Sequence, residues 1–107
     1  MSNQWLYLIL AGFFEVCWSV AMKLSDGLKR PLPTVVLAVT MALSVVLLSK
    51  ALQTLSLGTA YAVWTGIGAA GAAIVGVMWF GESASPLRIV SILLIVFGTV
   101  GLHITET

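Results

Sequence analysis

Long stretches without a single charged residue alternate with short charged segments along this chain. The uncharged stretches cover residues 1–14, 31–49, 51–81 and 89–105, and the first continues in apolar residues past Glu15 to Met22. Each stretch can therefore hold a helix of the roughly 17 to 25 residues that cross a bilayer. The pattern predicts four transmembrane helices, near residues 5–22, 32–51, 58–80 and 87–104.

Helix-boundary residues lie between these stretches. Lys23 and Gly27 form a helix-stop pattern after the first predicted helix, and Pro31 can open the second. Before the fourth predicted helix, Ser85 can serve as the N-cap and Pro86 as the first helical residue. Because the three connections are short, we expect an all-α, up-down-up-down bundle that forms a single transmembrane domain over residues 1–107.

The composition agrees with a lipid environment and excludes several classes of function. Hydrophobic residues make up 60% of the chain and charged residues 8%, with a net charge of +1. Soluble domains carry about 25% charged residues, and nucleic-acid binding needs a basic surface that this chain lacks. We expect no enzyme activity, no cofactor and no nucleic-acid partner. Gly66-x-Gly68-x-x-Gly71 has the letters of a dinucleotide fingerprint, but it lies inside an apolar helix, so we reject that interpretation.

Glu15 is the strongest functional signal because it lies inside a predicted membrane span. It follows Trp5 by ten residues, about 15 Å along a helix, which places it near the bilayer midplane. An acid at that depth costs at least ~2.5 kcal/mol and usually belongs to an ion or substrate pathway. In a dry site without a basic partner, it keeps a proton until a cation replaces it. The residue alone thus predicts exchange of a cation for protons, which compete for one carboxylate.

Small and aromatic residues share the expected faces around Glu15. Gly12 and Trp18, three residues before and after it, give access and an aromatic wall on its own helix. Tyr61 and Trp64 lie on one face of the third helix, where they can line the same cavity. A desolvated cation near an indole face gains ~1 to 2 kcal/mol. Ordinary helix packing is the competing interpretation of these aromatic residues.

The remaining small residues of interest lie in the third and second predicted helices. Gly68, Ala72 and Gly76 repeat every four residues and, with Gly66, predict close helix packing and a pliable third helix. Ser44 has no evident role from pattern alone, because such a hydroxyl usually bonds the carbonyl four residues earlier in its own helix.

The residues as a set resemble the small multidrug resistance family, and within it the guanidinium exporter subtype. The resemblance covers nearly the whole chain and rests on Glu15 followed by Trp18, on Lys23, and on the stretch Gly58-Thr59-Ala60-Tyr61-Ala62-Val63-Trp64-Thr65-Gly66-Ile67-Gly68-Ala69. It implies a multi-pass exchanger of the bacterial inner membrane that moves guanidinium outward for protons. It also implies an antiparallel homodimer with one protomer inserted each way up.

The resemblance further implies roles for individual residues. Glu15 would be the essential acid of each protomer, surrounded and oriented by Trp18, Ser44, Tyr61 and Trp64, with Ser44 as its hydrogen-bond partner. Three alternatives stay open at this point. The chain could export quaternary ammonium or other hydrophobic cations, form one subunit of a heterodimeric pair, or be a membrane subunit that transports nothing.

Overall fold

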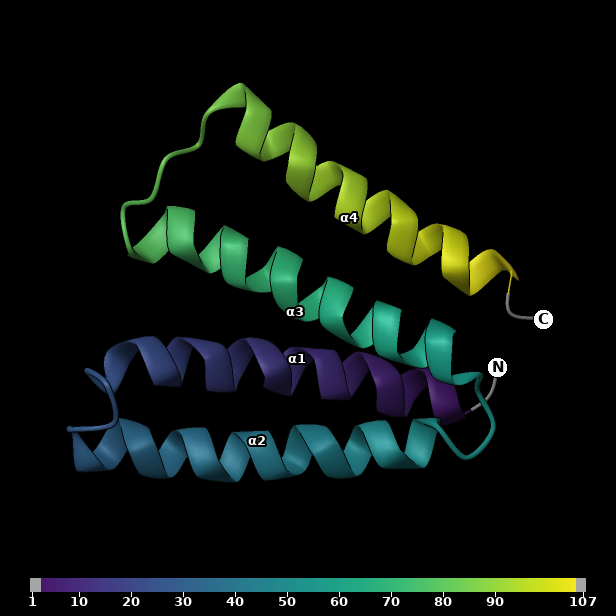
Figure 1. The fold of residues 1–107 in the computed structure, drawn as a ribbon, viewed down its shortest axis with the longest axis horizontal. Helices are drawn as coiled ribbons and strands as arrows, with labels where there is room; N and C mark the ends of the chain where they lie inside the picture. The colour runs from purple at the N-terminus through teal and green to yellow at the C-terminus, as the bar shows by residue number, and fades with distance from the viewer. Residues whose placement is uncertain (1–2, 106–107) are drawn as a thin grey trace.

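Four antiparallel helices make up the structure, a computed structural model that describes residues 3–105. They are α1 (Asn3–Leu24), α2 (Pro31–Ala51), α3 (Leu57–Trp79) and α4 (Pro86–Thr105). Figure 1 shows that the α1–α2 and α3–α4 loops lie at one end of the bundle, opposite the α2–α3 loop and both termini. Each helix is long and apolar enough to cross a membrane. The predicted four-span, all-α architecture is confirmed, with helix limits within two residues of those expected.

The α1–α2 loop is a tight turn organised by a buried serine. The Ser25 hydroxyl donates to the Met22 carbonyl (2.7 Å) and accepts from the Leu28 amide (3.0 Å). Asp26, Gly27 and Leu28 all have positive φ angles, of 52°, 69° and 70°. Such angles cannot continue a right-handed helix, and α1 ends at Leu24; of the three residues, Gly27 adopts them without steric cost.

The α3–α4 loop ends as the sequence predicts. Gly81 has a positive φ of 67°, and the chain leaves α3 there. The Ser85 hydroxyl accepts a hydrogen bond from the Arg88 amide at 3.3 Å, so Ser85 is the N-cap of α4. Pro86 is the first residue of α4, where its missing N–H leaves no hydrogen bond unmade.

Helix α1 lies at the centre of the bundle, between α2 and α3, and α3 also packs against α4 (Figure 1). The buried core joins α1, α2 and α3 in the half of the bundle nearer the termini. It comprises Trp5, Leu8, Ala11, Leu48, Ala51, Ala60 and Val63.

Helix α4 is the outlying element. It has no buried residue, and it diverges from α3 toward the loop that joins them (Figure 1). At its other end, the His103 ring meets the Trp5 ring edge to face, with 4.3 Å between centroids. This arrangement leaves a long apolar helix surface without a partner in the single chain.

Candidate functional site

The Glu15 carboxylate lies between the middles of α1 and α3. Glu15 follows the start of α1 at Asn3 by about 18 Å and precedes its end at Leu24 by about 14 Å. Its side chain reaches across to Gly68 of α3, so closely that any side-chain carbon at Gly68 would overlap the carboxylate. The Oε1 atom is buried and has no hydrogen-bond partner among residues 3–105. The Oε1 atom is therefore an acceptor that can bind a proton or a cation.

Trp18 adds an unpaired donor one turn along α1. Its Nε1 atom is also buried, and within the described part of the chain it has no acceptor. A buried polar group without a partner costs about 1 to 3 kcal/mol. Such groups are rare in folded proteins, so Glu15 Oε1 and Trp18 Nε1 are candidate contact atoms for a ligand. Glu15 and Trp18, three residues apart, thus place an unpaired acceptor and an unpaired donor on one side of α1.

A chain of two hydrogen bonds links α3 to α1 through α2. The Trp64 indole Nε1 donates to the Ser44 hydroxyl at 2.9 Å, and Ser44 donates to the Ala11 carbonyl at 2.7 Å. Ser44 is fully buried, and Ala11 lies one turn before Glu15. Successive hydrogen bonds polarise and strengthen one another in a low-dielectric interior. The network fixes the Trp64 ring and the helix turn that carries Glu15.

This network corrects two expectations about Ser44. The bond to its own helix is wrong, because the Ser44 O–H crosses to α1; it is Thr40 that bonds within α2, to Val36 at 2.7 Å. The bond expected from the family resemblance, to Glu15, also differs from what is seen. Because Ser44 has one O–H and Ala11 receives it, Ser44 acts on the site through Trp64 and the α1 backbone.

Tyr61 lies one turn before Trp64 and its ring contacts the Trp64 ring, with 5.4 Å between centroids and a tilt of 59°. Its side chain is 53% exposed in the single chain, whereas Trp64 packs against the core. Tyr61 thus extends the aromatic surface from the core outward. Within one protomer its ring supports the ring of Trp64.

The small residues of the site serve different neighbours. Gly12 is buried against Ile67, whose nearest atom would lie 2.6 Å from an added Cβ, so Gly12 admits α3 and not a ligand. That geometry corrects the expected access role of Gly12. Gly66 lies on another face of α3, against Thr99 of α4. Gly68 admits Glu15, a contact that the sequence pattern did not reveal.

Two other members of the small-residue stripe, Ala72 and Gly76, line a cavity of about 150 Å³ between α1 and the loop end of α3. Ser19, one turn beyond Glu15, lines it from α1, together with Lys23. Glu82 completes the lining as an acid that sequence reasoning passed over. The cavity lies on the seam that holds Glu15, nearer the α3–α4 loop.

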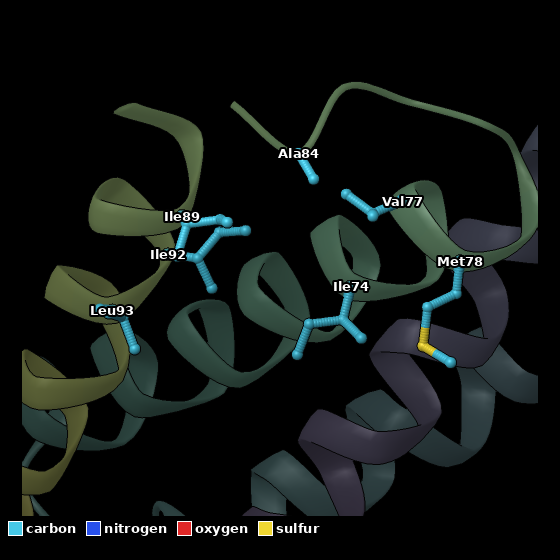
Figure 2. Close-up of a pocket in the computed structure, with 7 residues that line it drawn as sticks. All are labelled: Ile74, Val77, Met78, Ala84, Ile89, Ile92 and Leu93. Atoms are coloured by element: carbon cyan, nitrogen blue, oxygen red, sulfur yellow. The ribbon is translucent and has the colours of Figure 1, made fainter. Parts of the chain in front are cut away.

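A larger crevice between α3 and α4 has no such chemistry. Figure 2 shows its lining, and its volume is about 230 Å³. All seven residues are apolar: Ile74, Val77, Met78, Ala84, Ile89, Ile92 and Leu93. A cation would lose its hydration there without gaining a partner, so this crevice is no candidate for the cation site. Across residues 3–105, His, Cys, Asp and Glu also form no group of three that could hold a metal.

Comparisons with known proteins identify the family of the chain. Residues 3–95 match the family model of the Small Multidrug Resistance protein. The chain is 50% identical over 102 residues to the guanidinium exporter of Salmonella typhimurium, covering 95% of this chain and 97% of the relative. It is 48% identical, with the same coverage, to the guanidinium exporter of Escherichia coli K12. With four membrane-spanning helices, these matches support a multi-pass protein of the bacterial inner membrane. The chain belongs to the small multidrug resistance family.

Proposed function

We propose that this chain exports guanidinium across the inner membrane in exchange for protons, which bind in turn at Glu15. The observation that carries the proposal is the buried, unpaired Oε1 of Glu15 in the middle of α1. The guanidinium exporters that it resembles over nearly their full length support the choice of cation. The chain is on this account a transporter and not an enzyme.

Guanidinium fits the chemistry of the site. Its planar fork of N–H donors can approach a carboxylate with two parallel hydrogen bonds, and its face can stack on an indole ring. Glu15 supplies the carboxylate, and Trp64 supplies an indole held in place by its bond to Ser44. In a desolvated site, the indole face adds ~1 to 2 kcal/mol to the attraction.

Exchange of guanidinium for protons follows because both bind at the same Glu15 carboxylate. Glu15 can bind a proton or a cation, but a proton on the carboxylate removes the charge that holds guanidinium. Each ligand therefore lowers the affinity for the other, and this negative coupling is reciprocal. A protein that opens to either side of the membrane with only one ligand bound then moves the two in opposite directions.

The working unit in this proposal is a homodimer in which two protomers insert in opposite orientations. Support comes from the Trp18 Nε1–H, which has no acceptor within residues 3–105 and could donate a hydrogen bond to the Glu15 carboxylate of a second protomer. Further support comes from α4, which has no buried residue. Opposite insertion would give the inverted symmetry on which other transporters build alternating access. The two Glu15 carboxyls would then titrate as a coupled pair.

Proteoliposomes that contain only the purified chain test this function. Internal pH is followed with a trapped dye after a guanidinium gradient is imposed. We expect protons to move opposite to guanidinium, and Glu15→Gln to abolish the movement because it keeps the shape of the side chain without its charge. A Glu15→Gln variant that still exchanges would contradict the mechanism.

The same vesicles separate the alternatives. A tetraalkylammonium gradient that drives proton movement better than guanidinium would indicate a multidrug exporter. Activity that appears only after a second related chain is added would indicate a heterodimer. If no cation gradient changes the internal pH, the chain is a membrane subunit that does not transport.

A further inference from the structure

The second acid of interest, Glu82, lies in the α3–α4 loop and folds back onto α3. Its backbone amide donates to the Gly76 carbonyl at 3.1 Å. Its carboxylate lies against Gly76, so closely that a side-chain carbon at position 76 would overlap it. Gly76 thus makes room for Glu82 as Gly68 makes room for Glu15. The two acids lie on the same α1–α3 seam, at its loop end and at its middle.

The cavity of about 150 Å³ extends along this seam from Glu82 to the helical turn that follows Glu15. Glu82 lines it from the loop, and Ser19 lines it from α1, one helical turn beyond Glu15. A cation in this cavity would therefore lie beside the helical turn that follows Glu15. Among the residues that line the cavity, Glu82 is the one acid.

The partner of Glu82 in the structure is the guanidinium group of Arg88, at the start of α4. The carboxylate thus holds a substituted form of the cation that we propose as substrate. Both side chains of the pair are about one-third exposed, at 34% and 38%. Ion pairs with that exposure are weak, so a free guanidinium ion can displace the Arg88 head group.

From this geometry we infer that Glu82 forms an outer guanidinium-binding site and that Arg88 is its internal competitor. The inference rests on the proposed function, because it takes guanidinium as the transported cation. Free guanidinium replaces Arg88 on Glu82, occupies the cavity and then passes to Glu15. When the cation has left, Arg88 returns to Glu82 and the site is closed again.

Lys23 keeps the outer site weak. It lines the same cavity, and its ammonium lies 5.7 Å from the centroid of the Phe80 ring. A guanidinium ion on Glu82 would have this second positive charge nearby, which shortens its stay. A transport pathway needs such a balance, with binding strong enough to admit the cation and weak enough to release it.

Two neutralising substitutions test the inference because it predicts opposite effects. In proteoliposomes at low ionic strength, Glu82→Gln should raise the guanidinium concentration for half-maximal transport about two- to fivefold, the range expected for one exposed charge. Arg88→Gln should lower that concentration, because it frees Glu82. The double variant should behave as Glu82→Gln, since the competitor has nothing left to compete for.

Matched controls remove the same charges elsewhere on that end of the bundle. Asp26→Asn and Arg30→Gln, both in the α1–α2 loop, change the surface charge equally and should have little effect. The effects of Glu82→Gln and Arg88→Gln should also fade in high salt, which screens exposed charges.

Results that contradict the role of Glu82 differ from those that contradict the proposed function. If Glu82→Gln and Arg88→Gln both weaken transport, the ion pair only ties α4 to α3 and the inference is wrong. It is also wrong if the two loop controls reproduce the effects, because surface potential would then explain them. If the unaltered chain moves no guanidinium while it moves another cation, the proposed function fails instead.

Discussion

Replacing Gly68 by alanine tests whether α3 must leave room for the Glu15 carboxylate. A Cβ at position 68 would lie 2.8 Å from Glu15 Cγ and would overlap the carboxylate itself. One of the two groups has to move, and overpacking of this kind costs about 1 to 3 kcal/mol. If the Glu15 carboxylate is displaced and its cation binding carries this whole cost, guanidinium affinity should fall about 5- to 150-fold, since 1.4 kcal/mol is a factor of ten, and transport should fall with it.

The assay is guanidinium-driven proton movement in proteoliposomes, with Gly58→Ala as the matched control. Gly58 lies in the first turn of α3, and an added Cβ there would meet nothing within 4 Å. Gly12→Ala gives a second comparison, because its Cβ would overlap Cγ2 and Cβ of Ile67, at 2.6 and 2.7 Å, and would thus overpack the same α1–α3 contact without touching Glu15. If Gly68→Ala transports as well as Gly58→Ala, the close contact between Gly68 and Glu15 has no part in the mechanism.

Three further predictions concern the hydrogen bonds and the protons of the site. Ser44→Ala should destabilise the protein by about 1 to 3 kcal/mol in detergent unfolding, because it leaves the Trp64 Nε1 without an acceptor, whereas Thr40→Ala should cost little; equal effects would refute the network. Trp18→Phe should reduce transport more than it reduces stability, since the lost donor has no partner within residues 3–105; a loss of stability alone would make Trp18 a packing residue. Guanidinium affinity should fall as pH falls, by up to about tenfold per pH unit where protons compete for Glu15, and a flat profile from pH 6 to 9 would contradict that competition.

The sequence predicts the architecture well because each element has a local cause. Hydrophobic length sets the four spans, and capping chemistry at Gly27, Ser85 and Pro86 sets their limits. In lipid, a backbone can satisfy its hydrogen bonds only as helices or as a closed barrel. Four apolar stretches of helix length therefore allow few other folds. What the pattern lacks is information on how far each helix diverges, as α4 does from α3.

The site is less predictable because its contacts join different helices. Depth in the first span identified Glu15, but only the register between α1 and α3 reveals that Gly68 faces it. Ser44 shows the same limit: a hydroxyl in a helix usually bonds its own backbone, and only tertiary packing brings the Ala11 carbonyl within reach. Glu82 carried no signal in a loop where acids are common, until the structure placed it beside Gly76 and the cavity.

The central claim is that protons and guanidinium share the Glu15 carboxyl, and proton release on binding tests it most directly. Guanidinium chloride is added to the purified protein in a weakly buffered detergent solution near neutral pH, and the pH is recorded with an indicator dye. The account predicts proton release that saturates with guanidinium and is absent in Glu15→Gln. Guanidinium binding without proton release, or equal release from the Glu15→Gln variant, would contradict it.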